Sequence, residues 1–200
     1  MKKSILVITD GIGYNPKNYY NAFAAAKKRA YEYLFKNVPY SLIKTHGMSV
    51  GLPEGQMGNS EVGHMTIGSG RVLYQDLVRI SISLKDGSFE KNEIFRNFLN
   101  KNKRVHIIGL LSDGGVHSHI DHFIKIANIT SREKETFLHI ITDGRDVFFK
   151  SAIKYIKELQ NSAIEAKIAS IGGRFYTMDR DKRWDRVERG YKAIVQATPK

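Results

Sequence analysis

The chain has 200 residues, of which 42% are hydrophobic and 10% aromatic, enough to fill a core and too many for a disordered protein. Lysine and arginine together number 32 against 20 acidic residues, giving a formal charge of +12, and cysteine is absent. No apolar run approaches the roughly 20 residues of a membrane-spanning helix, so we expect a cytoplasmic protein without membrane association, disulfides or sulfur-ligated zinc.

Apolar runs and helical periodicities alternate along the chain, which predicts an α/β fold with mainly parallel sheets flanked by helices. The N-terminal part has predicted strands at 5–9 and 40–45, separated by a helix that Asn21 caps and that ends before Pro39. A glycine-rich stretch at 47–70 follows, of the kind that commonly forms a site. Beyond it the pattern predicts helices at 77–84, 94–99, 119–128, 152–159 and 184–194, and strands at 105–111, 137–141 and 168–171.

A domain boundary is predicted near residues 74–76, which divides the chain into residues 1–75 and 76–200. The first part contains only two predicted strands, too few to close a sheet. The sequence also ends directly after a helix, with no closing strand. We therefore expect both parts to be incomplete and to belong to a longer chain.

Two residues of the N-terminal part are candidates for metal and phosphate chemistry. Asp10 follows the first predicted strand, at the edge where open α/β sheets bind ligands, although an Asp-Gly pair can also be a plain turn. Ser60 lies where the glycine-rich stretch gives way to a helix, a position that favours phosphate. It is either a plain helix cap or a nucleophile, and a nucleophilic serine needs activation. Because no His-Asp relay is spaced near it, a metal is the expected activator.

Basic residues follow three successive predicted strands of the second part. His117 follows the first, Arg145 and Asp146 the second, and Arg174 and Arg180 the third. Each arginine taken alone is also compatible with a solvated surface charge, and His117 with packing against the next helix. Together they predict a cationic pocket for a small polyanion, because guanidinium groups bind phosphate and carboxylate. Acidic residues interrupt the basic ones between 174 and 189, so no nucleic-acid groove is expected.

Four segments of the chain carry a family resemblance, and they occur in family order over nearly its whole length. They are residues 52–64 (LPEGQMGNSEVGH), 109–119 (GLLSDGGVHSH), 143–146 (DGRD) and 178–186 (MDRDKRWDR). On these segments the chain resembles the N-terminal portion of the cofactor-independent (2,3-bisphosphoglycerate-independent) phosphoglycerate mutases of the alkaline phosphatase superfamily.

This resemblance implies an isomerase of glycolysis and gluconeogenesis that interconverts 3-phosphoglycerate and 2-phosphoglycerate through a phosphoserine intermediate, with two Mn2+ ions in the full-length site. It implies that Ser60 is the nucleophile and a metal ligand, that Asp10 is a metal ligand, and that the substrate is held by His117, Arg145, Asp146, Arg174 and Arg180. Residues 1–75 would be part of an alkaline-phosphatase-like domain, and residues 76–200 part of an inserted transferase domain. The remaining ligands of the family lie in a part absent here, so we expect this piece alone to be inactive.

Two alternatives stay open at this point. One is another phosphomutase or phosphatase of the same superfamily, and the other is a non-catalytic module that binds anions. For the mutase we expect 2-phosphoglycerate and 3-phosphoglycerate as ligands, a monomeric protein, and neither nucleic acid nor membrane as a partner.

Overall fold

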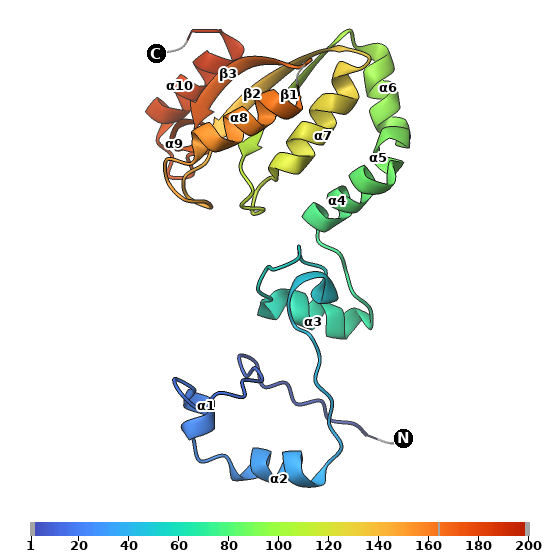
Figure 1. Ribbon diagram of the computed structural model, residues 1–200, viewed down its shortest axis with the longest axis vertical. Helices are drawn as coiled ribbons and strands as arrows, with labels where there is room; N and C mark the ends of the chain where they lie inside the picture. The colour runs from blue at the N-terminus through green and yellow to red at the C-terminus, as the bar shows by residue number, and fades with distance from the viewer. Residues whose placement is uncertain (1–2, 164, 199–200) are drawn as a thin grey trace. The chain divides into compact units, whose positions relative to one another are not determined.

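The computed structural model describes residues 3–163 and 165–198 and divides the chain into two compact units, Met1–Leu73 and Tyr74–Lys200. Figure 1 shows the helices and strands of both units. We describe each unit by itself, beginning with the second, which contains the sheet.

The second unit is built on three parallel strands in the order β1-β2-β3. They are β1 (Arg104–Leu111), β2 (Glu135–Thr142) and β3 (Lys167–Gly173). β1 and β2 pair in register along their whole length, whereas the pairing of β2 with β3 is interrupted by an irregularity at Leu138/His139. The predicted α/β class with a parallel sheet is therefore confirmed, and all three strands predicted for this unit form.

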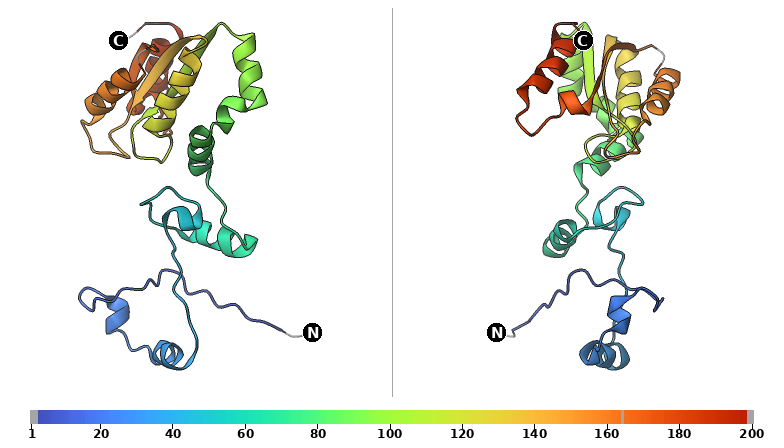
Figure 2. Two further views of the ribbon diagram at one scale, coloured as in Figure 1. Left: turned by 45° about the vertical axis from the view of Figure 1, so that its right-hand side comes forward. Right: turned by 90° about the vertical axis from the view of Figure 1, so that its left-hand side faces the viewer.

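Helices cover both faces of this sheet, as the side view in Figure 2 shows. One face carries α7 (Ile120–Ser131) and α8 (Ala152–Ser162), and the other carries α9 (Arg174–Thr177) and α10 (Trp184–Val195). The unit begins with α4 (Asp76–Asp86), α5 (Ser88–Lys91) and α6 (Glu93–Lys101). All five predicted helices of this unit are confirmed, while the short α5 and α9 are not apparent from the sequence pattern.

Strand alternation determines which side chains reach the core of the second unit. Leu138 and Ile140 of β2 are each 1% exposed and pack with Phe123 of α7 and Leu159 of α8. Successive side chains of a strand point to opposite faces, so His139 lies on the other face. There its ring nitrogens make hydrogen bonds with His106 of β1 (2.9 Å) and Ser170 of β3 (2.8 Å).

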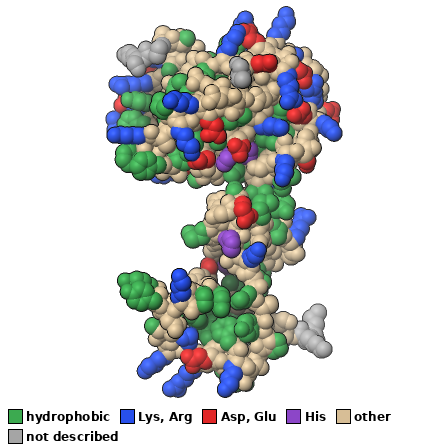
Figure 3. Space-filling view, in the orientation of Figure 1, with side chains coloured by type: hydrophobic (Ala, Val, Ile, Leu, Met, Phe, Trp, Pro, Cys, Tyr) green, Lys and Arg blue, Asp and Glu red, His purple; other side chains and the backbone are tan. Residues whose placement is uncertain are grey.

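The first unit contains four short helices and, among its described residues, no strand. They are α1 (Ala22–Ala25), α2 (Arg29–Asn37), the 3₁₀ helix η1 (Gly47–Val50) and α3 (Ser60–Ser69). The strands predicted at 5–9 and 40–45 are wrong for this structure: both segments are irregular, and Ile5 is 89% exposed. A strand needs a neighbour to pair its backbone groups, and these described segments have none. Both segments leave apolar side chains exposed, and hydrophobic side chains lie on the surface of the first unit in the space-filling view (Figure 3).

The helix predicted after Asn21 forms in two pieces. Asn21 caps α1 as expected, because its side chain accepts a hydrogen bond from the amide of Ala24. The break follows at Ala26, whose backbone is extended. In a continuous helix, the carbonyl oxygen of Ala24 would accept a hydrogen bond from the amide of Lys28. Here the same oxygen accepts from Lys28 Nζ instead, at 2.9 Å.

Among the described residues, no helix is both long and apolar enough to cross a membrane.

Candidate functional site

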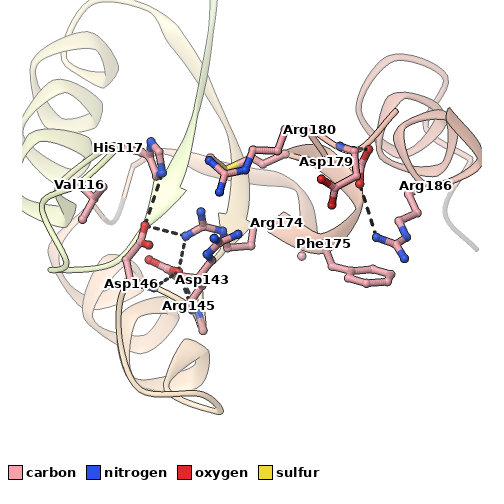
Figure 4. Close-up of a pocket in the computed structure, with 14 residues that line it drawn as sticks. Val116, His117, Asp143, Arg145, Asp146, Arg174, Phe175, Asp179, Arg180 and Arg186 are labelled. Carbon is pink, nitrogen blue, oxygen red and sulfur yellow. Dashed lines mark hydrogen bonds and ion pairs between the residues drawn. The ribbon is translucent and has the colours of Figure 1, made fainter. Parts of the chain in front are cut away.

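An open pocket of about 820 Å³ lies beside the carboxyl ends of the three strands. Its lining comes from the loops that follow β1 and β2 and from the segment that begins directly after β3 (Figure 4). Open parallel sheets bind ligands at this edge, because the loops after the strands converge there. The lining includes four arginines and four aspartates, namely Arg145, Arg174, Arg180, Arg186, Asp143, Asp146, Asp179 and Asp181.

All five residues predicted to hold a substrate line this one pocket. His117 comes from the loop after β1, and Arg145 and Asp146 come from the loop after β2. Arg174 is the first residue of α9, and Arg180 lies between α9 and α10. The structure thus brings together side chains that lie up to 63 positions apart in the sequence, from His117 to Arg180.

Asp143 is the most enclosed charged group of the pocket, with a side chain 1% exposed. Its Oδ1 accepts hydrogen bonds from the amides of Gly144, Arg145 and Asp146 at 2.9–3.1 Å, and its Oδ2 accepts one of 2.7 Å from Ser112 Oγ. Burial by itself raises the pKa of this carboxyl. The hydrogen bonds from Ser112, the loop amides and Arg174 outweigh burial and hold the pKa of Asp143 well below its usual range.

Arg174 is held between two carboxylates. Its Nη1 donates to Asp143 Oδ1 at 2.8 Å and to Asp146 Oδ2 at 2.6 Å. Burial by itself lowers the pKa of Arg174, but the bonds to the two aspartates raise it overall. Asp146 Oδ2 also lies 3.8 Å from His117 Nε2, so three loops meet around these two carboxylates.

Arg145 and Arg180 differ from Arg174 in having uncommitted guanidinium groups. Within residues 3–163 and 165–198, no hydrogen bond or ion pair engages either side-chain head. Figure 4 shows Arg180 directed toward the side of the pocket where His117 and Arg174 lie. A guanidinium fork without a carboxylate partner is suited to bind a ligand carboxylate or phosphate.

Asp179 organises the other side of the pocket. Its side chain is 3% exposed, and Oδ2 accepts from the amides of Asp181 (3.1 Å) and Arg183 (2.8 Å). Its Oδ1 accepts from Arg186 at 3.5 Å, and the Arg186 guanidinium lies 3.9 Å from the ring centroid of Phe175. The turn that carries Arg180 is therefore held by a buried carboxylate, like the turn that carries Arg145.

Four charged residues of the pocket were not among the predicted site residues: Asp143, Asp179, Asp181 and Arg186. All four lie in the segments 143–146 and 178–186. An Asp-Gly pair directly after a buried strand is a signal that was available for Asp143, because a carboxylate there can accept the amides of the following turn. The sequence pattern gives no comparable signal for the partner of Arg186.

In the first unit, the Ser60 side chain is close enough to Asp10 to influence its carboxyl. Interaction with Ser60 is the main cause that lowers the pKa of Asp10. Ser60 is the first residue of α3, and the helix is capped by Asn59, whose side chain accepts from the amide of Val62 at 3.0 Å. The plain-cap alternative for Ser60 is therefore wrong, and its hydroxyl is left for other contacts at the helix N-terminus.

His64 lies one helical turn after Ser60 in α3. His64 Nδ1 is 3.2 Å from Ser60 Oγ and 2.8 Å from the Ser60 carbonyl oxygen. A carbonyl oxygen only accepts hydrogen bonds, so Nδ1 carries a hydrogen atom. A protonated Nδ1 does not take a proton from the hydroxyl, and His64 is therefore not placed as a general base in this arrangement.

A divalent cation fits the donor chemistry of Asp10 and Ser60, because carboxylate and hydroxyl oxygens are ligands of hard cations. The pair makes only part of a coordination sphere. In the part of the chain that the structure describes, no three His, Asp or Glu side chains come together as a metal-binding group.

Comparison with known proteins identifies relatives over the whole chain. The family described as "BPG-independent PGAM N-terminus (iPGM_N)" matches residues 80–200. The chain is 63% identical to the 2,3-bisphosphoglycerate-independent phosphoglycerate mutase of Sulfurimonas denitrificans, over 100% of this chain and 41% of that protein. It is 57% identical to the enzyme of the same name from Helicobacter pylori, over 97% of this chain and 40% of that protein.

A solved structure shares the fold. The crystal structure of Leishmania mexicana phosphoglycerate mutase at low cobalt concentration matches with a TM-score of 0.64 and 33% sequence identity. The match covers 96% of this chain and 38% of that one. The chain thus spans about 40% of the length of the relatives that it matches.

Proposed function

The chain belongs to the family of bisphosphoglycerate-independent phosphoglycerate mutases, and from this membership we propose that the protein that carries it interconverts 3-phosphoglycerate and 2-phosphoglycerate. The reaction is an isomerisation that moves one phosphoryl group between two hydroxyl oxygens of glycerate. We place the enzyme in glycolysis and gluconeogenesis and in the cytoplasm, and we propose that it is a monomer.

One observation carries this proposal: the guanidinium groups of Arg145 and Arg180, which have no partner among the described residues, share a pocket with Arg174, which two carboxylates fix. Phosphoglycerate has two anionic groups, a carboxylate and a phosphate, and each is suited to a guanidinium fork. His117 and Asp146 supply a ring nitrogen and a carboxylate for the hydroxyl of the ligand. We therefore propose that His117, Arg145, Asp146, Arg174 and Arg180 hold the substrate.

Ser60 is proposed as the residue that carries the phosphoryl group. In the first half-reaction the Ser60 Oγ–P bond forms and the ester bond between phosphorus and the glycerate oxygen breaks. The interaction of Ser60 with the Asp10 carboxyl supports this role, because a carboxylate near the hydroxyl favours increased electron density on Oγ. In the second half-reaction the other glycerate hydroxyl takes the phosphoryl group from Ser60.

Retention of glycerate between the two steps distinguishes a mutase from a phosphatase. Arginines that remain bound to the carboxylate keep the acid from leaving while it reorients, and they raise its effective concentration toward the phosphoserine. Such a hold also disfavours loss of the phosphoryl group to water.

Asp10 and Ser60 are proposed as ligands of one of two Mn2+ ions. A bound divalent ion would lower the pKa of the serine hydroxyl and offset charge on the phosphoryl oxygens. With two donors in place, the described residues supply part of the coordination set. We therefore propose that this chain alone does not turn over, that residues 1–75 belong to a phosphatase-like domain and that residues 76–200 belong to a transferase domain.

The proposal is tested in two assays. Coupled measurement of 2-phosphoglycerate formation, with added Mn2+, compares the 200-residue chain with a protein extended to the length of its relatives; we expect turnover by the longer protein only. Titration calorimetry on the 200-residue chain compares 3-phosphoglycerate with an oligonucleotide of random sequence. Phosphate release in place of isomerisation would support a phosphatase, and tighter binding of the oligonucleotide would support an anion-binding module.

A further inference from the structure

The carboxylate of Asp143 connects three separate segments of the second unit. Through Oδ2 it binds Ser112, directly after β1, and through Oδ1 it binds the turn 144–146 after β2. The same Oδ1 accepts from Arg174, the first residue of α9. One side chain therefore links the polypeptide that follows each of the three strands.

The side chain of Asp143 offers a ligand almost no surface, because it is 1% exposed. Its neighbours in the chain are differently placed: Arg145 and Asp146 line the pocket, and their own amides are bound to Asp143. A buried carboxylate is tolerated only when hydrogen bonds replace its hydration. Here five donors do so; removal of the carboxylate would leave the Ser112 hydroxyl and the three amides without this acceptor and Arg174 with Asp146 alone.

Asp143 also limits the directions that Arg174 can take. Arg174 donates from Nη1 to both Asp143 and Asp146, so the guanidinium plane is fixed by two acceptors on the same turn. Since the turn is itself bound to Asp143, the two contacts are not independent. Loss of the Asp143 carboxylate would remove one acceptor of Arg174 and would make the position of the other, Asp146, less fixed.

We propose that Asp143 is a positioning residue of the pocket, which orients Arg174 and the turn that carries Arg145 and Asp146 without contacting the ligand. The inference rests on the proposed function only for the identity of the ligand. The orientation of Arg174 can be measured with no ligand present.

Asp113 provides a matched control, because it is an aspartate two residues after β1 that is not part of the pocket lining. Its carboxylate accepts from the Tyr155 hydroxyl and lies 3.5 Å from Lys154 Nζ. Asp143→Asn and Asp113→Asn therefore make the same chemical change inside and outside the pocket. Asparagine keeps the shape of aspartate but removes the charge and turns one acceptor oxygen into a donor nitrogen.

The test records the Nε–H signal of Arg174 by ¹⁵N NMR in the 200-residue chain, assigned by its loss in Arg174→Lys. We expect this signal to shift and broaden in Asp143→Asn and to stay in place in Asp113→Asn. Calorimetry is then expected to show 3-phosphoglycerate binding weakened about tenfold or more in Asp143→Asn only, the scale typical of residues that orient ligand-binding groups. An unchanged Arg174 signal in folded Asp143→Asn would overturn the inference.

The outcomes separate the inference from the proposed function. If the unaltered chain binds no 3-phosphoglycerate, the function proposed for the pocket fails, and the Arg174 signal alone decides the role of Asp143. If Asp143→Asn does not fold, Ser112→Ala is used instead, because it removes one donor to the Asp143 carboxylate. The Nε–H signal of Arg174 is then recorded in this variant. A shifted Arg174 signal in that variant supports the inference, and an unshifted one contradicts it.

Discussion

Arg174 binds Asp143 and Asp146 through one nitrogen atom, Nη1, at 2.8 and 2.6 Å. Its Nη2 and Nε have no hydrogen-bond partner among the described residues, and they remain available to a ligand. Two carboxylates therefore orient Arg174 but engage only one of the three nitrogen atoms of its guanidinium group. The guanidinium groups of Arg145 and Arg180, in contrast, have no partner at all within the described part of the chain.

We predict that Arg145→Ala and Arg180→Ala weaken binding of 3-phosphoglycerate to the chain by about 10- to 100-fold each, the range that corresponds to a lost hydrogen bond with a charged group. Because neither guanidinium is paired within the described residues, the midpoint of thermal unfolding should stay unchanged. Calorimetry and thermal melts measure the two effects. Arg79→Ala, which alters an exposed arginine paired with Asp76, is the control and should leave affinity unaltered. Equal affinity in all three variants would exclude the pocket as the binding site.

We predict that Ser60→Ala abolishes the phosphoenzyme in the full-length protein while α3 stays folded. The helix keeps its cap, because Asn59 and not Ser60 accepts from the amide of Val62. Mass spectrometry after incubation with 3-phosphoglycerate and Mn2+ detects the phosphoserine. His64→Gln removes the imidazole but leaves the hydroxyl, and phosphoenzyme should still form in it. Phosphorylation that persists in Ser60→Ala would assign the nucleophile to another residue.

Gly190→Ala should destabilise the second unit. A Cβ at this position of α10 would lie 2.6 Å from Thr177 Cγ2 and 3.3 Å from Thr177 Cα, and overpacking of this kind typically costs about 1–3 kcal/mol. Alanine favours a helix over glycine by about 1 kcal/mol, which offsets part of the loss. Urea unfolding measures the net change in the free energy of unfolding. The double variant with Thr177→Ser lacks the obstructing methyl group and should recover stability; a double variant no better than Gly190→Ala would contradict this account.

Tyr155→Phe should lower the free energy of unfolding by about 1 kcal/mol, the typical net value of one hydrogen bond. Tyr155 is buried, and its hydroxyl donates to Asp113; burial, followed by this bond, raises the pKa of Tyr155 to about 12. The phenol of the unaltered chain should therefore ionise late in an absorbance titration, and this late step should be missing from the variant. Tyr191→Phe alters an exposed tyrosine of α10 and should change neither quantity.

The stability of the chain should fall as the pH is lowered below about 6.5, the ordinary pKa of histidine. Burial and the neighbouring His106 lower the pKa of His139 in the folded state. Below the unfolded-state pKa the unfolded chain binds more protons than the folded one, so acidification favours unfolding until the folded-state pKa is passed. Thermal melts at a series of pH values measure the slope. His139→Asn should reduce this slope but not abolish it, because burial also lowers the pKa of His122; an unchanged slope would exclude His139 as a source.

The second unit could be predicted from the sequence because its strands and helices bury their own periodic faces. Leu138 and Ile140 alternate with His139 along β2, and this alternation matches the layers of the fold. In the first unit, the apolar run at 5–9 gives the same local signal, but no described strand lies beside it. The local sequence pattern predicts which segments are able to form strands. Whether such a segment forms a strand depends on a neighbouring strand with which its backbone can pair.

The pocket could be predicted in part for a similar reason. Parallel strands bring their carboxyl ends to one edge, so residues that follow them, such as His117, Arg145 and Arg174, were expected to meet there. The partner of each arginine depends on side-chain geometry across loops. The sequence therefore pointed to Arg145, Arg174 and Arg180, but not to Arg186. It also did not predict that Asp143 fixes Arg174 or that Asp179 fixes Arg186.

The four arginines and four aspartates that line the pocket cancel in formal charge, although the whole chain carries +12. Attraction of an anion into this pocket therefore depends on contacts within a few ångströms and not on a far-reaching positive field. A ligand small enough to reach Arg145 and Arg180, whose guanidinium groups have no partner among the described residues, gains their full donor capacity. Its affinity should accordingly change little with ionic strength.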